Sequence, residues 1–159
     1  MAINTAAAVM RIESPLSYSR PVIPGLVNPA LPLRPKRNPR HLHERGASSF
    51  GVVYVNDIAR RAMMEMRQPE FPVGSVIVRE KMLSRDEAQE PQMLAVMVKR
   101  ERGFNKRAND WEFLLLDGRA SAVTLRQKTG DCRSCHLSEK KNDFVFRTYL
   151  PESVRGKLQ

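Results

Sequence analysis

The chain has 159 residues, a formal net charge of +10, 42% hydrophobic residues and only two cysteines. This length suits one domain with a buried core and argues against a two-domain enzyme. No run approaches the ~18 apolar residues of a membrane span, and two cysteines exclude both a disulfide framework and an all-cysteine zinc site within one chain.

The first 45 residues differ from the rest. Seven of the eleven prolines fall in the first forty residues, and residues 1–45 carry seven Lys/Arg against two Glu, a net charge of +5. Because proline interrupts helices and central strands, we interpret 1–45 as a flexible arm or an unprocessed leader, and 46–159 as the folded domain. The arm contains one aromatic residue, Tyr18, so a solvated segment is favoured over a nucleic-acid contact.

No export signal is evident at the start of the chain. The small apolar run 6–10 is shorter than the ~7–15 residues of a signal-peptide core, and Arg11 ends it.

Strand and helix patterns alternate from residue 50 onward. The β-rich run 51–55 predicts a strand, and Asn56 and Asp57 offer a cap for a helix over 58–66. Further strands are predicted over 75–82, 93–99, 110–116 and 120–126, with Asp117-Gly118 as a hairpin turn, then a short helix over 130–141 and an extended segment over 144–149. Strands in series with few helices predict an α+β domain around an antiparallel sheet.

Both cysteines belong to one pentapeptide, Cys132-Arg-Ser-Cys-His136. This is the C-x-x-C-H pattern of covalent c-type haem attachment. One helical turn places two thiols along an edge of the porphyrin, and the next residue offers an imidazole to the iron. The pattern predicts one haem c, with thioethers from Cys132 and Cys135 and His136 as the axial ligand.

Two other chemistries fit the same residues less well. A thioredoxin-like dithiol is expected at the start of a helix near the beginning of its domain, whereas Cys132 lies 27 residues from the end of the chain. A zinc site would need Cys132, Cys135 and two of the three histidines, of which His41 and His43 lie on the arm.

The position of the motif bears on the sixth iron ligand. Only 23 residues follow His136, and none of them is methionine or histidine. The distal position therefore holds an upstream side chain, water or nothing, whereas a small electron carrier has a downstream methionine. Met93 and Met97 are the upstream candidates if the protein is an electron relay.

Several segments together resemble the cytochrome P-460 family, including its cytochrome c′-beta members. They are Val53–Asp57, Phe71–Val78, Val96–Lys99, Asp110–Phe113, the late C-x-x-C-H motif and Asp143–Pro151, covering roughly residues 50–151. The resemblance implies a β-rich haem domain, often a homodimer, with five-coordinate haem c. It also implies one of two activities: hydroxylamine oxidation by a haem cross-linked to a lysine, or reversible binding of nitric oxide without a cross-link.

Two positions bear on the choice between these activities. Arg79 stands where the resemblance places the cross-linking lysine, and a guanidinium is not a usable nucleophile. Lys81 lies one pleat further on the same strand face, where it could substitute or be a solvated strand-end charge. Ala95 aligns with the oxidases' distal carboxylate, and Glu112 is a weak alternative for that carboxylate.

These departures favour an apolar distal pocket with Phe71, Ile77 and Ala95 near the iron and Arg79 as a hydrogen-bond donor. We therefore expect a periplasmic haem c protein that binds nitric oxide or a similar small nitrogen or oxygen species. The alternatives are an oxidase of hydroxylamine or nitric oxide, with a partner cytochrome as electron acceptor, and an electron-transfer cytochrome. Periplasmic location is expected despite the missing signal, because covalent haem attachment takes place outside the cytoplasmic membrane.

Overall fold

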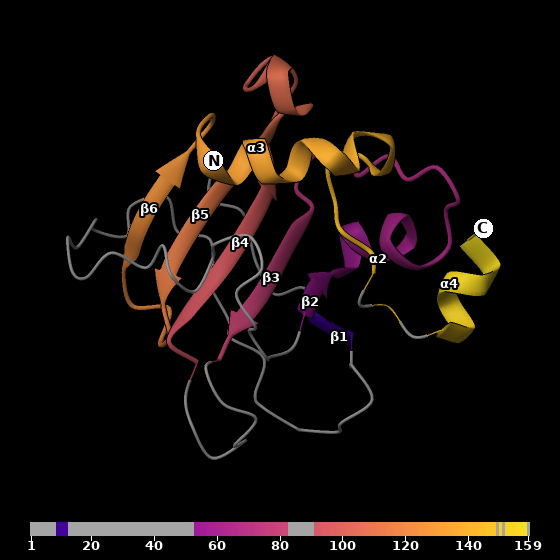
Figure 1. Cartoon of the computed structure of the whole chain (residues 1–159), viewed down its shortest axis with the longest axis horizontal. Coiled ribbons are helices and arrows are strands. Elements are labelled where there is room, and N and C mark those ends of the chain that lie inside the picture. Colours follow the sequence, from indigo (N-terminus) through magenta and orange to yellow (C-terminus); the bar gives the residue numbers. More distant parts are fainter. Residues whose placement is uncertain (1–8, 13–52, 83–90, 149, 151, 159) are drawn as a thin grey trace.

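The computed structural model describes residues 9–12, 53–82, 91–148, 150 and 152–158. Its centre is an antiparallel sheet in which the six described strands lie side by side in chain order, β1 to β6 (Figure 1). The elements are β1 (Val9–Ile12), β2 (Val53–Asn56), α2 (Asp57–Met64), β3 (Val76–Lys81), β4 (Met93–Lys99), β5 (Trp111–Asp117), β6 (Val123–Gln127), α3 (Asp131–His136) and α4 (Glu152–Leu158), with 3-10 helices at Lys106–Ala108 and Leu137–Asn142. The predicted α+β class with an antiparallel sheet is confirmed.

Asn56 joins β2 to α2 as the sequence predicts. Its Oδ1 accepts from Ala59 N at 3.1 Å, which caps the helix, and from Val76 N at 3.0 Å. Its Nδ2 donates to Gly74 O at 2.9 Å. One buried amide thus starts α2 and fixes the turn that leads into β3.

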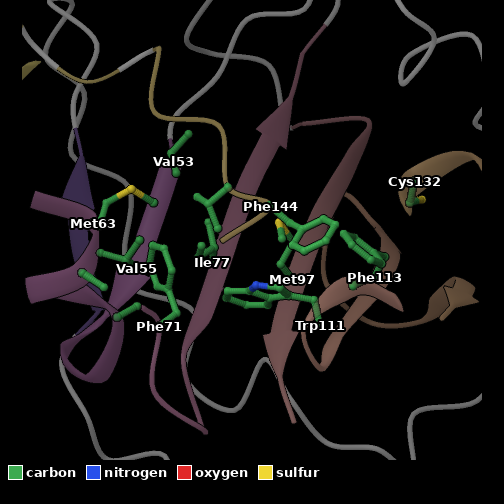
Figure 2. Packing of buried hydrophobic residues seen from close by; sticks show 14 of the residues in the cluster. Val53, Val55, Met63, Phe71, Ile77, Met97, Trp111, Phe113, Cys132 and Phe144 are labelled. Carbon is green, nitrogen blue, oxygen red and sulfur yellow. The ribbon is translucent and has the colours of Figure 1, made fainter. Parts of the chain in front are cut away.

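One face of the sheet, here called the α2 face, carries the main core. Val55, Ile77, Met97 and Phe113 are register partners across β2 to β5, and their side chains therefore share a face. Buried residues of α2 and of the segment after α3 pack against them, and Figure 2 shows this cluster. They include Ala59, Ala62, Met63, Phe144 and Val145.

The opposite face of the sheet is also buried. Its cluster includes Tyr54, Val78, Leu94, Val96 and Leu114. Burial on both faces explains why β4 and β5 read as nearly continuous apolar runs rather than alternating ones.

The turn between β5 and β6 differs from the two-residue hairpin expected at Asp117-Gly118. The residue with left-handed backbone is Ala120, with φ of 56°, and Asp117 Oδ1 accepts from Ser121 N at 2.6 Å. Gly118 is needed for another reason, because a Cβ there would lie 1.6 Å from the carbonyl oxygen of Pro91.

The C-terminal segment folds back onto α2. Residues 144–148, predicted as extended, form no strand in the part of the chain that the structure describes, and α4 after them was not predicted. Arg147 donates to the carbonyl oxygens of Met66 at 2.7 Å and Arg67 at 3.1 Å, and to those of Ala62 and Met63 at 3.4 Å. Its guanidinium therefore binds the carbonyl oxygens at the end of α2.

Four residues of the predicted arm form β1, an edge strand paired with β2. The remainder of 1–45, like 46–52, lies outside the described residues. None of the described helices is long and apolar enough to cross a membrane.

Candidate haem-binding site

The helix α3 carries all three residues of the haem motif. Gly130 precedes it with φ of 98°, a backbone conformation that suits glycine. Gln127 Oε1 accepts from Cys132 N at 3.3 Å, and Arg133 Nε donates to Arg107 O at 3.0 Å. These bonds attach α3 to the end of β6 and to the loop between β4 and β5, so the two thiols sit on one fixed helical turn.

Both cysteines are free thiols in the structure. Burial, with a smaller contribution from Asp131, raises the pKa of Cys132 to about 11. A redox-active dithiol needs a thiolate of low pKa, so this environment disfavours the thioredoxin-like alternative.

The imidazole of His136 is oriented by one short hydrogen bond. Its Nδ1 lies 2.6 Å from the carbonyl oxygen of Phe144. A carbonyl can only accept, so Nδ1 carries the proton and Nε2 presents its lone pair. Burial lowers the pKa of His136, which favours the neutral form. This tautomer is the one that ligates a metal through Nε2.

Two aromatic rings enclose the imidazole. Its centroid lies 5.2 Å from the Phe113 ring on β5 and 4.9 Å from the Phe146 ring. The contact of Phe146 with His136 could not be predicted, because an aromatic residue in an extended segment gives no signal of which ring it will contact.

A row of side chains crosses the α2 face beside the core cluster. Arg79, Ala95, Leu115 and Leu125 are register partners on β3 to β6, and we call them the Arg79 row. Ala95 and Leu125 are partly exposed and pack against buried Met93 and Leu115. The row is thus an apolar surface with a cation at one end.

Lys81 extends this surface by one pleat. Burial, with a smaller contribution from the charge of Arg79, lowers the pKa of Lys81 to about 8, and Cys135 partly offsets the shift. Lys81 in turn contributes to the lowered pKa of His136. These effects put Arg79, Cys135 and His136 each within electrostatic reach of Lys81.

The arrangement fits a covalently held haem. Two thiols on one turn, an imidazole with a free Nε2 and an apolar surface with cations nearby match a porphyrin with vinyl groups, iron and carboxylates. Among the described residues, no group of three His, Cys, Asp or Glu side chains is placed to hold a metal ion by itself. The zinc alternative depended on His41 and His43, which lie outside the described residues.

Other predicted residues lie elsewhere. Phe71 packs edge-on against Trp111 at 5.5 Å, on the far side of the core cluster from Cys132 (Figure 2). The structure therefore does not bring Phe71 to the motif. Ile77 lies in the core row beside Met97. Glu112 lies on the opposite face of the sheet, paired with Arg100 and Arg126, and is not available as a distal carboxylate.

Asp143, to which the sequence analysis gave no role, is the most heavily bonded carboxylate near the motif. Its oxygens accept from Lys99, Phe71 and Asn109. These donors are separated from Asp143 by 34 to 72 residues, a distance in sequence that gives no local pattern.

A cavity of about 840 Å³ has Asp143 among its lining residues, but neither the two cysteines nor His136. It is lined by residues of the 3-10 helix after α3, of the segment after α2 and of α4, including Glu70, Lys140 and Arg155. None of the predicted distal residues lines it, so it is not the ligand pocket predicted from sequence.

A comparison with protein-family models matches the Cytochrome P460 model over residues 34–147. No curated protein matches the chain. The match includes the haem motif, the Arg79 row and Phe144, and it begins inside the segment interpreted as an arm. Since it covers well over half of the residues, the chain belongs to the cytochrome P460 family.

Proposed function

We propose that this chain is a mono-haem c-type cytochrome that binds nitric oxide or a similar small nitrogen or oxygen species. Cys132 and Cys135 would hold the haem through thioethers, and His136 would ligate its iron. The observation that carries the proposal is the 2.6 Å contact between His136 Nδ1 and Phe144 O, which leaves Nε2 free on the helix that also carries the two thiols. The haem, when bound, supplies an iron that takes up small ligands and exchanges single electrons.

The composition of the Arg79 row supports an open sixth position. Ala95, Leu115 and Leu125 have no group that ligates iron, and a guanidinium is a hydrogen-bond donor rather than a ligand. Neutral diatomic molecules suit such a surface, because no side chain of the row competes for the iron. Arg79 would donate a hydrogen bond to the bound ligand.

Oxidation of hydroxylamine or nitric oxide is the second candidate, and Lys81 is the observation that favours it. An amine with a pKa of about 8 is partly neutral near physiological pH, and a neutral amine can form the cross-link that Arg79 cannot. A cross-linked haem would give a mass altered from that of two simple thioethers and a red-shifted ferrous spectrum.

An electron-transfer role would require a strong sixth ligand. Met93 packs against Leu115 of the Arg79 row, whereas Met97 lies in the core between Ile77 and Phe113. Met93 is therefore the better candidate of the two. A low-spin ferrous spectrum that does not change with nitric oxide would favour this role.

Location and assembly follow the same proposal. Covalent haem attachment supports a periplasmic protein, and the resemblance to the cytochrome P-460 family supports a homodimer. Light scattering of the purified protein would test the dimer, since a mass near 18.1 kDa would show a monomer.

The decisive experiment measures the intact mass of the full chain made together with the haem-attachment machinery. We expect a haem-sized increment that Cys132→Ala and Cys135→Ala together abolish. Ser134→Ala, which removes only the hydroxyl that donates to Gly130 O, is the matched control and keeps the increment. A ferrous protein whose spectrum shifts on adding nitric oxide supports ligand binding. Absence of the increment in the wild-type chain would overturn the proposal.

A further inference from the structure

The Phe144 carbonyl that orients His136 lies in a strained turn. Asp143 and Phe144 both have left-handed backbone, with φ of 53° and 64°. Two consecutive residues with side chains rarely adopt this conformation, and it persists only where surrounding contacts hold it. The turn ends the 3-10 helix Leu137–Asn142, which connects it to His136 at the end of α3.

Asp143 supplies those contacts. Its Oδ2 accepts from Phe71 N at 2.9 Å and from Lys99 Nζ at 2.7 Å, and its Oδ1 accepts from Asn109 Nδ2 at 2.7 Å. Trp111 Nε1 donates to its backbone oxygen at 2.8 Å. The residue is only 6% exposed. Donors from β4, from β5 and from the segments before β3 and β5 thus hold one turn.

The charges in this cluster are matched. Lys99, itself 7% exposed, places its ammonium on the carboxylate and 5.0 Å from the centre of the Trp111 ring. An ion pair with several further hydrogen bonds holds the carboxylate in one position, and removal of either partner leaves an uncompensated buried charge.

The Phe144 carbonyl is only one peptide unit beyond these anchors. Phe144 N also donates to Glu139 O at 2.8 Å, so the peptide that precedes the carbonyl is held on both sides. Movement of Asp143 would therefore change the 2.6 Å contact with His136 Nδ1. A well-aligned acceptor on Nδ1 raises the basicity of Nε2, which strengthens a bond from Nε2 to a metal.

We propose that Asp143, with Lys99 as its counter-ion, is a positioning residue that sets the strength of the axial bond from His136 to the haem iron. The inference rests on the proposed function, because it needs a bound haem. It assigns a role at the iron to a buried ion pair that contacts neither the thiols nor the imidazole in any described interaction.

The test compares full-length haem-bearing variants by resonance Raman spectroscopy and redox titration. In Asp143→Asn the lysine loses its anion and the turn loosens. The iron–histidine stretching frequency should fall, and the reduction potential should rise because a weaker donor stabilises ferric iron less. An unchanged frequency and potential in Asp143→Asn would overturn the inference.

Glu112→Gln is the matched control. Glu112 is a buried carboxylate, 3% exposed and paired with Arg100 and Arg126, but it lies on the opposite face of the sheet. Its loss should lower stability and leave the stretching frequency unchanged. An equal frequency shift in Glu112→Gln and Asp143→Asn would show a general loosening and would contradict a positioning role.

Two further measurements keep the inference testable. If Asp143→Asn does not fold, Trp111→Phe is the second variant, because it removes the donor to the Asp143 backbone oxygen. It should lower the iron–histidine stretching frequency by a smaller amount. No change in that frequency would overturn the inference. If the wild-type chain carries no haem, the proposed function fails separately. Nitrogen-15 NMR of His136 then tests the positioning step, and Asp143→Asn must reduce protonation at Nδ1, since an unchanged tautomer would contradict it.

Discussion

The guanidinium of Arg79 projects from the middle of β3 on the α2 face, in line with Ala95, Leu115 and Leu125. A hydrogen bond from a charged donor contributes about 1.5–3 kcal/mol, and 1.4 kcal/mol corresponds to a factor of ten in an equilibrium constant. Under the proposed function, Arg79 is therefore the residue of the row that we expect to have the largest effect on how long a polar diatomic ligand stays bound.

We predict that Arg79→Leu speeds dissociation of nitric oxide or oxygen from the ferrous protein by about ten- to hundredfold, because the bound ligand loses a charged donor. Stopped-flow measurements with a trapping agent would record the rate. Arg79→Lys keeps the charge but loses the planar guanidinium, so its dissociation rate should lie between those of the wild type and Arg79→Leu. Equal rates for Arg79→Leu and the wild type would place Arg79 away from the ligand.

Lys81 makes the stability of the haem-free chain depend on pH. Burial and the charge of Arg79 lower its pKa to about 8 from an ordinary value near 10.5. The unfolded chain thus binds more protons between these values, so this group's contribution to the free energy of unfolding rises with pH across that window. Below pH 8 the charged ammonium destabilises the fold by a constant amount.

We therefore predict that Lys81→Met stabilises the haem-free chain most at pH 7 and that its advantage shrinks towards pH 10. Urea unfolding at both pH values gives the comparison. Lys106→Met, a substitution of an exposed lysine on the loop between β4 and β5, is the control and should show no such trend. An advantage of Lys81→Met that grows with pH would contradict the lowered pKa.

At the scale of elements, the C-terminal segment stabilises the end of α2 through the hydrogen bonds of Arg147. Arg147 is 8% exposed and reaches four carbonyl oxygens between Ala62 and Arg67. We predict that Arg147→Met costs about 3 kcal/mol in the free energy of unfolding, because the buried carbonyls lose a charged donor. Urea unfolding of the full chain measures this.

Arg155→Met provides the comparison for Arg147→Met. Arg155 forms an ion pair on α4 with Glu152, whose side chain is 93% exposed, and such pairs contribute little. Its loss should change stability by less than about 0.5 kcal/mol. Equal effects of the two variants would show that the carbonyl contacts of Arg147 do not stabilise α2.

The strands could be predicted because their signals are local. The bounds of β3 to β6 differ from the predicted ranges by at most three residues. The side chain of Asn56 caps α2 as predicted. The segment after α3 could not be predicted in this way, because its conformation depends on Arg147 and Asp143, whose partners are up to 85 residues away. The helix α4 could not be predicted from a local pattern either, because none of its residues is buried.

The haem motif could likewise be recognised from its spacing, whereas its surroundings could not. Lys99 and Asp143 both fall in segments that carry the family resemblance, yet nothing local pairs two residues 44 positions apart. Phe71 was expected near the iron together with Ile77 and Ala95, whereas its ring packs against Trp111 in the structure. Only the register of the sheet places Leu115 and Leu125 in one row with Arg79 and Ala95.

At the scale of the whole molecule, the charge of +10 divides evenly between 1–45 and 46–159, although the family match begins at residue 34. The family match therefore extends into the basic, proline-rich segment, and β1 pairs with β2 at the edge of the sheet. The first 45 residues therefore include an edge strand of the sheet and part of the family match, and a deletion meant to test their charge should end before Val9.

The fold and the haem should depend on each other. The Arg79 row has two apolar side chains, Ala95 and Leu125, that the described protein covers only in part, and a covalent porphyrin over them would bury further apolar surface. A covalent haem stays attached when the chain unfolds, so it shifts the unfolding equilibrium towards the folded state only through the contacts that it makes there. We predict that the haem-bearing chain is more stable than the Cys132→Ala/Cys135→Ala chain by about 2 kcal/mol or more, as measured by urea unfolding. Ser134→Ala should match the wild type, and equal stability with and without haem would mean that the porphyrin does not cover the Arg79 row.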